Sequence, residues 1–432
     1  MPARSVQVQL NVQGMPDTKL VLVGSGCEGA WTPAPPTSLS PPVTSISWES
    51  ESDPDGIWQG TQGWVRYYPV TPGGTVPSNV PDEDTVCITW DDPDIGGNTY
   101  TATAPAAYTI YGGSILDYVA DNDSAVFNLS FTPQTPTTKT APALAYFARG
   151  PLGNQLVLAY VATNGSNDLF VTTTDTLGTW SQFTAIARQS SAIAPALTQF
   201  NDTGQLALAY VANNPTLDLL VTLSKDGVNW SPLAQVQGQS SPMAPAIAAI
   251  ANYLVLVYVA DNATNDLLVT TSLDGVSWGD PTPIAGQSSS SSPAIAVLDG
   301  VLYVAYVANN ATNDLLVTSA KQIFDWTPPV LVGGQSSSIG PALAAYGGQL
   351  VMAYVAANGS NDLIVTTSTN GTAWTPSQAV TGQSTSMTPA LGSLAGGDLA
   401  LVYAANNENQ RLIISTSADA ITWKPGTNLI SS

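Results

Sequence analysis

Histidine is absent from this sequence of 432 residues, and charged residues are scarce at 9%. Without histidine, a Ser-His-Asp triad, a Cys-His pair and a histidine metal site are all excluded. The few charges are unbalanced, because 10 Lys and Arg stand against 31 Asp and Glu and give a net charge of −21. No basic stripe is present, so nucleic acid and anionic lipid are poor partners on Coulomb grounds. A cation, or a neutral partner such as a sugar or a zwitterionic lipid, suits the chain better.

Long apolar runs are also missing. No stretch of 18 apolar residues occurs, so the sequence predicts no membrane-spanning helix. Residues 1–12 contain no apolar signal core, which indicates that a conventional signal peptide is absent or has been removed. We therefore expect a protein that is secreted or released without such a peptide and acts at a target membrane surface. Cysteine is limited to Cys27 and Cys87, which form either one disulfide or two buried thiols.

The sequence does contain one unit that is repeated six times between residue 141 and the C-terminus. A tyrosine and a closing tryptophan each recur at intervals of 48 to 50 residues. The tyrosines are Tyr160, Tyr210, Tyr258, Tyr306, Tyr354 and Tyr403, and the tryptophans are Trp180, Trp230, Trp278, Trp326, Trp374 and Trp423. A fixed period of this size indicates a stacked or radial array of one supersecondary unit.

The copy over residues 244–291 shows what one unit contains. Two short apolar segments, a β-branched segment and a short segment opened by Trp278 predict four strands, and no helical period appears. The polar residues 261–266 and the pair Asp274-Gly275 predict turns. Four strands in about 48 residues are typical of one propeller blade, so residues 141–432 are predicted to form a six-bladed β-propeller. A β-solenoid is the alternative.

The tight turn before each tryptophan has a further pattern. The segments 224–230 (SKDGVNW), 272–278 (SLDGVSW) and 368–374 (STNGTAW) resemble the Asp-box hairpin of sialidase-like propellers, one residue shorter than its usual form. In that family the box is a structural turn remote from the active site. The resemblance therefore implies a marker of the fold rather than a site.

Residues 1–133 lack the repeat. Residues 6–12 alternate between apolar and polar side chains, and several short β-type segments separated by turn signals follow. This pattern predicts a β-sandwich. Residues 134–140 are rich in Thr and are predicted to be a short, semi-rigid linker. The predicted fold class is thus all-β, with an N-terminal β-sandwich followed by a six-bladed β-propeller.

A second resemblance concerns the predicted sandwich. The segments 60–68 (GTQGWVRYY), 86–93 (VCITWDDP) and 115–118 (ILDY) occur in the order and spacing of an aegerolysin, and the match covers roughly residues 5–133. Aegerolysins are small acidic β-sandwiches that recognise membrane lipids, often sphingolipids with sterol, and several need a second, pore-forming protein. The resemblance implies lipid binding of this class and a pore-forming partner in a toxin system. Asp92 departs from the family, because many members have Cys there.

Aromatic residues are dense in the first domain and supply its candidate lipid contacts. Trp and Tyr favour the headgroup level of a membrane. The candidates are Trp31, Trp58, Trp64 and Trp90. Trp31 and Trp58 lie beside Gly and Pro residues of predicted loops, so we expect these two to be the exposed ones. The alternative is that the aromatic residues form the sandwich core.

Candidate carbohydrate contacts lie in the repeated polar turn. An Asn follows each repeat tyrosine by four residues, and an Asp follows it by eight in five of the six copies. These residues are Asn164, Asp168, Asn214, Asp218, Asn262, Asp266, Asn310, Asp314, Asn358, Asp362 and Asn407, with Arg411 in the last Asp position. In the structural interpretation, these side chains bond their own backbone. In the binding interpretation, they form a ring of equivalent sites for neutral glycans.

The same turns raise the question of a metal ion. Oxygen ligands at residues 261–266 suit Ca²⁺, but their spacing departs from that of an EF-hand loop. We therefore expect no metal site and no cofactor, with Ca²⁺ in the polar turns as the alternative.

Catalytic chemistry is hard to assemble from this sequence. Sialidases hold their substrate with three Arg and use a Glu–Tyr pair, whereas the predicted propeller offers Arg149, Arg188 and Arg411 at non-equivalent positions and only Glu408. Glycoside hydrolysis needs two carboxylates at one bond, and the repeated Asp residues are dispersed around the ring. We therefore expect no enzyme, but a binding protein with a lipid-recognising sandwich and a glycan-binding propeller. A sialidase-like hydrolase and a protein-docking scaffold are the alternatives.

Overall fold

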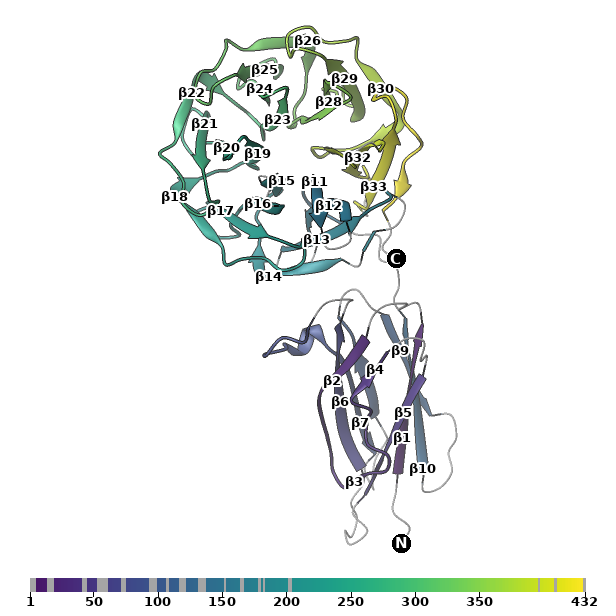
Figure 1. Cartoon of the computed structure of the whole chain (residues 1–432). Coiled ribbons are helices and arrows are strands. Elements are labelled where there is room, and N and C mark those ends of the chain that lie inside the picture. Colours follow the sequence, from purple (N-terminus) through teal and green to yellow (C-terminus); the bar gives the residue numbers. More distant parts are fainter. Residues whose placement is uncertain are drawn as a thin grey trace. The chain divides into compact units, whose positions relative to one another are not determined.

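The computed structural model describes most of the chain. The described residues are 5–13, 19–40, 45–52, 61–70, 75–92, 99–105, 109–115, 122–130, 137–150, 153–163, 167–177, 180–181, 183–200, 204–394, 397–407 and 410–429. They belong to two compact units, Met1–Gln134 and Thr135–Ser432. Each unit has hydrophobic cores of its own, and Figure 1 labels most strands of both.

The first unit consists of two five-stranded sheets. Their strand orders are β3-β5-β1-β10-β9 and β4-β2-β6-β7-β8. The elements are β1 (Ser5–Gln13), β2 (Lys19–Cys27), β3 (Ala30–Trp31), β4 (Ser38–Leu39), β5 (Ser45–Glu51), β6 (Thr61–Val70), the 3-10 turn η1 (Asp82–Asp84), β7 (Val86–Asp92), β8 (Thr99–Thr103), β9 (Thr109–Ile115) and β10 (Asn122–Ser130).

Both sheets contribute to one hydrophobic core. Val8 of β1 and Trp48 of β5 come from the first sheet, and Val65 of β6 and Ile88 of β7 come from the second. Within β1 the buried side chains alternate with exposed ones, as the sequence pattern predicts for a strand with one face in the core. Cys27 and Cys87 are both free thiols in this unit.

The second unit consists of six four-stranded sheets. Their strands are β11 (Ala143–Gly150), β12 (Gly153–Val161), β13 (Asp168–Thr174) and β14 (Thr184–Ser190) in blade 1; β15 (Ala196–Phe200), β16 (Gln205–Val211), β17 (Asp218–Ser224) and β18 (Ala234–Ser240) in blade 2; β19 (Ala246–Ile250), β20 (Tyr253–Val259), β21 (Asp266–Ser272) and β22 (Thr282–Ser288) in blade 3; β23 (Ala294–Leu298), β24 (Val301–Val307), β25 (Asp314–Ala320) and β26 (Val330–Ser336) in blade 4; β27 (Ala342–Tyr346), β28 (Gln349–Val355), β29 (Asp362–Ser368) and β30 (Gln378–Ser384) in blade 5; and β31 (Ala390–Ser393), β32 (Leu399–Ala404), β33 (Leu412–Ser417) and β34 (Thr427–Asn428) in blade 6.

These six sheets form a closed ring, as Figure 1 shows. The innermost strand of each blade contacts the innermost strand of the next, and β31 of the last blade contacts β11 of the first. The predicted six-bladed β-propeller is therefore confirmed, and the solenoid alternative is excluded. The second strand of each blade lies between neighbouring blades, so both of its faces are buried; in β20 every residue after Tyr253 is buried. This position explains its continuous apolar sequence.

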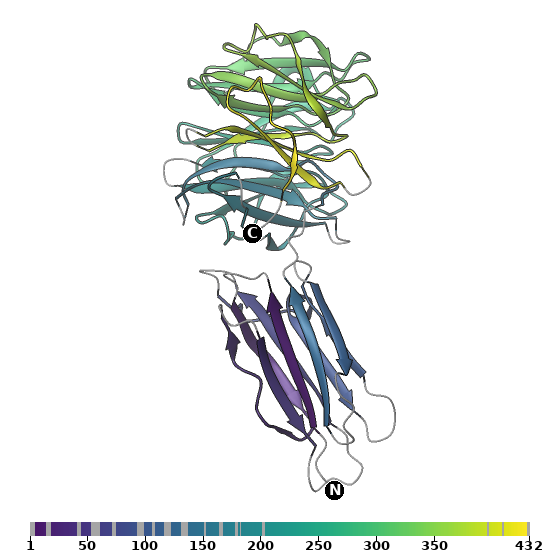
Figure 2. The same ribbon diagram turned by 90° about the vertical axis from the view of Figure 1, so that its right-hand side faces the viewer.

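The antiparallel order within each blade places its turns on two opposite faces of the ring. Turns between second and third strands lie on one face, which we call the polar-turn face; their described residues are 162–163, 167, 212–217, 260–265, 308–313, 356–361, 405–407 and 410–411. Hairpins between third and fourth strands lie on the other, which we call the box face; their described residues are 175–177, 180–181, 183, 225–233, 273–281, 321–329, 369–377 and 418–426. Figure 2 shows the ring from the side.

The ring is closed by residues that the sequence predicts to be linker. In blade 6 the fourth strand, β34, has only two residues, and Thr137 completes it by forming a bridge with Arg411. The N–H of Thr138 donates to the carbonyl of Gln410 at 3.2 Å, and the buried Thr138 hydroxyl lies 2.9 Å from the carbonyl of Val161. Residues 137–140 therefore belong to the propeller. They occupy the position that, in the other blades, is filled by the residues that follow the fourth strand.

Five other residues make a backbone hydrogen bond equivalent to the one from Thr138 to Gln410. In each, a backbone N–H that follows the fourth strand donates to the carbonyl of the last residue in the polar turn of the same blade. The pairs are Ser191–Asn167, Ser241–Leu217, Ser289–Asn265, Ser337–Asn313 and Thr385–Asn361. We call residues 137–140 the clasp, since they supply the sixth copy from the other end of the chain.

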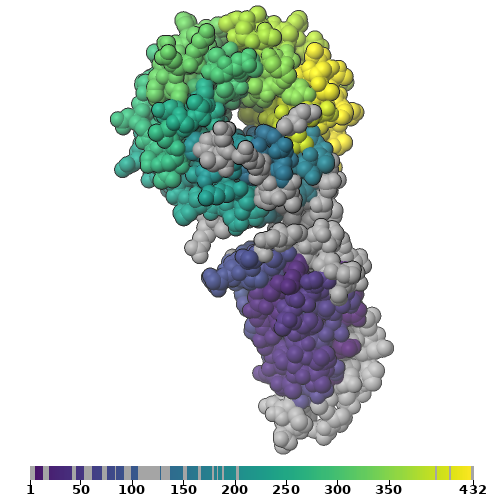
Figure 3. Space-filling model, in the orientation of Figure 1, coloured from purple at the N-terminus to yellow at the C-terminus, as the bar shows by residue number. Residues whose placement is uncertain are grey.

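A small hollow lies at the centre of the ring, where Figure 3 shows an opening. It measures about 130 Å³ and is lined by the Ala-Pro-Ala type segments that lead into the innermost strands, such as 141–144 and 244–247. The side chains of these segments are mostly small and apolar, whereas the repeated Asn and Asp side chains lie in the turns of the blades.

Candidate carbohydrate site

The polar turn of blade 2 is held by its own side chains. Asn214 donates from Nδ2 to Oδ2 of Asp218 at 2.9 Å, and the Thr216 hydroxyl donates to the same oxygen at 2.8 Å. The N–H of Ala212 donates to the Asp218 carbonyl at 2.8 Å, which closes the turn. One carboxylate oxygen of Asp218 is therefore committed to the turn, whereas Oδ1 accepts no hydrogen bond within the part of the chain that the structure describes.

The same arrangement recurs in other blades. In blade 4, Asn310 and Thr312 donate to Oδ2 of Asp314 at 3.0 and 2.7 Å, and in blade 3 Asn262 donates to Oδ2 of Asp266 at 3.0 Å. In blade 5 the Ser360 hydroxyl bridges Asn358 and Asp362 at 2.6 and 2.5 Å. These Asp residues are half-buried and most of the Asn residues are exposed. The turns therefore present a repeated carboxylate oxygen in a fixed orientation.

The first and last blades depart from this pattern. Asn164 lies outside the described residues, whereas Asp168 is described and half-buried. In blade 6, Oδ1 of Asn407 accepts from the N–H of Gln410 at 3.1 Å, and Arg411 replaces the aspartate. Among the described residues, no cluster of three His, Cys, Asp or Glu side chains is close enough to hold a metal ion.

The repeat tyrosines do not offer stacking surfaces for a sugar. Tyr258 and Tyr354 are buried between blades, and their hydroxyls donate to Oε1 of Gln239 and Gln335 in the preceding blade at 2.5 and 2.8 Å. Burial raises the pKa of Tyr258 far above its ordinary value, so the hydroxyl stays protonated as a donor. The glutamine partners belong to the Gly-Gln-Ser segment that ends most repeats. That repeated segment is the signal from which the sequence could have predicted this contact.

The box hairpins are structural turns on the opposite face. In blade 3 the Ser272 hydroxyl accepts from the N–H of Gly275 at 2.8 Å, and Gly275 has a φ of +73°. A side chain at Gly275 would also lie 2.9 Å from Leu223 of blade 2, so glycine is needed for both backbone geometry and close packing. The box hairpin thus packs against the neighbouring blade, a contact that the sequence analysis did not predict.

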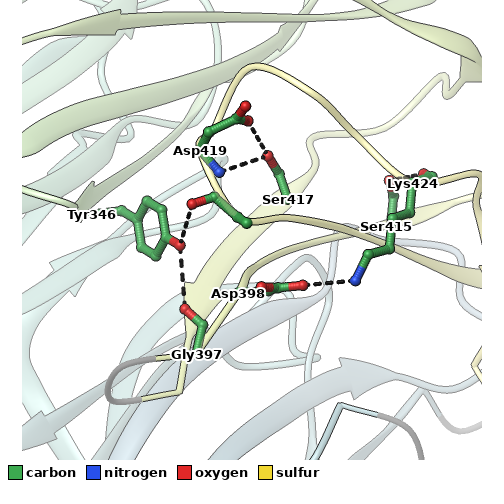
Figure 4. Close-up of polar contacts among 8 residues, drawn as sticks. Tyr346, Gly397, Asp398, Ser415, Ser417, Asp419 and Lys424 are labelled. Atoms are coloured by element: carbon green, nitrogen blue, oxygen red, sulfur yellow. Dashed lines mark hydrogen bonds and ion pairs between the residues drawn. The ribbon is translucent and has the colours of Figure 1, made fainter.

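Blades 5 and 6 show a second contact of this kind, which Figure 4 draws. The hydroxyl of Tyr346, at the end of β27, donates to the carbonyls of Gly397 and Ala418 in blade 6 at 3.3 and 3.1 Å. Beside them, Lys424 forms an exposed ion pair with Asp398 at 2.8 Å. Tyr346 therefore joins blades 5 and 6 on the box face.

Two carboxylates of the box hairpins, Asp274 and Asp419, have lowered pKa values. Oδ1 of Asp274 accepts from the N–H groups of Ser277 and Val276 at 2.7 and 2.8 Å, and these bonds lower the pKa of Asp274 from 3.8 to about 2. Backbone N–H donors also lower the pKa of Asp419 to about 2. Because both carboxyls have lower pKa values when folded, their contribution to stability is complete above about pH 4 and is lost as the pH falls toward 2.

We expect the urea midpoint of the propeller to stay level from about pH 7 to 5 and to fall between about pH 4 and 2. Asp274→Asn should make that fall smaller, with little change at pH 7, because Asn370 already accepts the equivalent two N–H bonds in blade 5 at 2.9 and 3.0 Å. Urea unfolding followed by tryptophan fluorescence across this pH range measures the effect. An identical acid dependence in the variant and the parent would contradict the assignment.

In the first unit, the four candidate tryptophans occupy different environments. Trp90 is 2% exposed, donates from Nε1 to the Ser50 hydroxyl at 3.0 Å and meets Trp31 edge-on at 5.7 Å between ring centroids. This buried place does not suit a lipid contact, and Trp90 is a core residue. Trp31 is half-buried, although we expected it to be exposed, because it packs against the same core. Trp58 lies outside the described residues.

Among the three candidate tryptophans that the structure describes, Trp64 is the exposed one, at 37%. Its ring lies over Gly24 and Gly26 of the neighbouring strand, where any added Cβ would come within 3.1 Å of it. The guanidinium of Arg66 stands 4.7 Å from the ring centroid and pairs with Asp82 at 2.5 Å. A hollow of about 680 Å³ opens beside this stack on the outer face of the second sheet.

Comparison with known proteins shows the fold. No family model matches the chain, and no curated protein matches it. Among solved structures, the Aleuria aurantia lectin, described as a six-bladed β-propeller with a fucose recognition mode, is 15% identical, with a TM-score of 0.50 over 68% of this chain and 97% of the lectin. The BP39L lectin from Burkholderia pseudomallei is 15% identical, with a TM-score of 0.51 over 85% of this chain and 95% of the lectin.

An enzyme shares the same architecture. An α-L-arabinofuranosidase from Fusarium graminearum is 15% identical, with a TM-score of 0.50 over 66% of this chain and 95% of the enzyme. At such identities the likeness establishes the propeller fold alone. Lectins and a glycosidase both use this fold, so function has to be argued from the residues on the two faces.

Proposed function

We propose that the protein is a non-enzymatic lectin whose propeller binds neutral glycans at several equivalent polar turns. The observation that supports this proposal most strongly is the repeated Asp of the polar-turn face. In blades 2, 3 and 4, hydrogen bonds fix one oxygen of Asp218, Asp266 and Asp314. The other oxygen accepts no hydrogen bond from the described residues, so it can accept from a ligand hydroxyl. An acceptor held in place before binding loses little entropy when a sugar hydroxyl reaches it.

The number of copies matters as much as the individual contact. A single half-buried carboxylate with a neighbouring amide forms a weak site for a neutral sugar. Several such sites on one face of a rigid ring raise the overall affinity for a clustered glycan by orders of magnitude. The likeness to six-bladed lectins of known structure agrees with this arrangement, and the excess of negative charge favours an uncharged ligand.

The test replaces the free oxygen without disturbing the turn. In Asp218→Asn, Asp266→Asn and Asp314→Asn combined, the remaining side-chain oxygen still accepts from the Asn of the turn, and in blades 2 and 4 also from its Thr. An NH₂ replaces the other carboxylate oxygen. We expect the signal of the full chain on an array of neutral glycans to fall by about tenfold or more, because three sites are lost together. The melting temperature should stay within about 2 °C of the parent, since the turn bonds remain.

The matched control is Asp274→Asn, which makes the same chemical change in blade 3 on the box face. It should leave glycan binding unchanged. If the triple variant binds as well as the parent, the polar turns serve only the fold. If the parent itself binds none of the glycans, the lectin proposal fails.

For the first unit we propose membrane-lipid recognition of the sphingolipid type, with action at a target membrane surface and a pore-forming partner. This proposal depends on the aegerolysin resemblance of the sequence. It is supported by the exposed Trp64, since an exposed indole beside a hollow suits the headgroup level of a bilayer. Sedimentation of Trp64→Ala with sphingomyelin–cholesterol vesicles tests it, because the parent should bind and the variant should bind more weakly.

A further inference from the structure

The box face exposes apolar side chains at one repeated position. This position lies two residues before the closing tryptophan of the blade, at the tip of the hairpin. It is occupied by Val228, Val276, Phe324 and Ile421, which are 45%, 58%, 47% and 61% exposed. Single exposed apolar residues are ordinary on protein surfaces, but four at one position of a repeat form a pattern. Leu273, 57% exposed in the same hairpin as Val276, adds to it.

These tips stand at one level around the ring. The register of the second and third strands is identical from blade to blade, as in the pairs Leu254–Ser272 and Leu302–Ala320, so the hairpins start at the same level of each blade. Among the described residues, the polar-turn face exposes no large apolar side chain. The propeller therefore has one polar face and one face with a ring of separate apolar tips.

Charge decides which partner suits this face. Lys225, Lys321 and Lys424 lie on the box hairpins together with Asp226 and other carboxylates, so the rim has charges of both signs. A surface of alternating headgroup charges complements such a rim, whereas anionic lipid is opposed by the net charge of −21.

The spacing of the tips argues against a protein partner. A stable protein interface has a contiguous apolar core. Here polar and exposed residues of the hairpins, such as Asn229, Ser277 and Thr422, separate the tips. Isolated side chains at one level can each enter a soft, planar surface, as amphipathic elements do at the boundary between headgroups and acyl chains.

We propose that the box face of the propeller docks on a bilayer of zwitterionic lipid and inserts Val276, Phe324 and Ile421 at the headgroup level. This contact is separate from the glycan sites, which lie on the opposite face, and from the lipid recognition proposed for the first unit. A chain held in this way presents its polar turns away from the membrane, toward glycans in solution or on a second surface.

The experiment uses the full chain and phosphatidylcholine vesicles in a flotation assay. The combined variant Val276→Asp, Phe324→Asp and Ile421→Asp should lower the vesicle-bound fraction at least tenfold. The control is Ala263→Asp, Ala311→Asp and Ala357→Asp, which adds the same charge at exposed positions of the polar-turn face and should stay within twofold of the parent. Phosphatidylglycerol vesicles at low salt should bind the parent less than phosphatidylcholine vesicles do.

Three results would overturn the proposal: no binding by the parent, a box-face variant within twofold of the parent, or an equal loss in both aspartate variants. Should the box-face variant fail to fold, Val276→Thr, Phe324→Thr and Ile421→Thr replaces it, because Thr372 occupies this position in blade 5. The threonine variant should lose several-fold in bound fraction, and unchanged binding would count against the proposal. Loss of glycan binding in a separate array experiment has no bearing on this outcome.

Discussion

A propeller that begins at residue 141 is expected to melt at least about 6 °C below one that begins at residue 135. The shorter chain lacks the clasp and its hydrogen bonds to the ring, among them Thr138 N–H to Gln410, Thr163 N–H to Thr137, and the Thr138 hydroxyl to Val161. Each is worth about 1 kcal/mol net, and a domain of this size shifts by about 2 °C per kcal/mol. The loss also leaves the short β34 without its continuation.

Differential scanning calorimetry of the two chains measures this difference. The full chain with Thr138→Val serves as a control, since it keeps the backbone bonds and loses only the hydroxyl; we expect a drop of about 2 °C. Equal melting temperatures for the chains that begin at 135 and 141 would show that the clasp does not hold the ring. In that case residues 137–140 would be only a tether, as their composition first indicated.

The second large effect is expected at Gly63 in the first unit. A Cβ at this position would lie 2.4 Å from Cζ2 of Trp90 and 2.8 Å from the carbonyl oxygen of Gly26. Trp90 cannot move aside, because its ring is buried and its Nε1 is bonded to Ser50. We expect Gly63→Ala to lower the free energy of unfolding of this unit by about 3 kcal/mol, in the range that overpacking costs.

Gly24→Ala is the matched comparison. Its Cβ would lie 3.0 Å from Trp64, but this ring is 37% exposed and can shift toward solvent. We expect a cost of about 1 kcal/mol or less. Urea unfolding of the full chain, followed by near-UV circular dichroism of the tryptophans, measures both variants. Similar losses of unfolding free energy in the two variants would contradict the conclusion that Trp90 packs more rigidly against Gly63 than Trp64 packs against Gly24.

The propeller could be predicted from the sequence because its signal is repeated and local. Tyr258 and its equivalents occupy one buried position between blades, and Trp278 and its equivalents follow one tight turn, so each copy reinforces the others. The polar turns were found for the same reason. The side-chain hydrogen bonds to the Asp residues of these turns join residues four apart or fewer, as between Asn214 and Asp218, and such contacts follow from local turn chemistry.

What the sequence could not show depends on contacts between distant segments. Trp90 looks like an interfacial aromatic residue in the sequence, but Gly63 lies opposite it on the neighbouring strand and opens a slot that accepts the ring. Likewise the Thr-rich stretch around Thr138 looks like a linker, because its partner Gln410 lies near the other end of the chain. The exposed tips at Val276 and Phe324 were missed because an apolar residue in a hairpin gives no sign of which way it points.

The bond from Thr138 to Gln410 has five near-identical counterparts around the ring, so the place where the chain begins and ends is structurally interchangeable. Circular permutants that open the backbone after β18 or β26, with the native ends of the propeller joined, should rebuild the same closure with Ser241 or Ser337 in place of Thr138. Such permutants would move the attachment point of the first unit step by step around the rim. They would provide a way to set the angle at which any fused module is displayed relative to the polar turns.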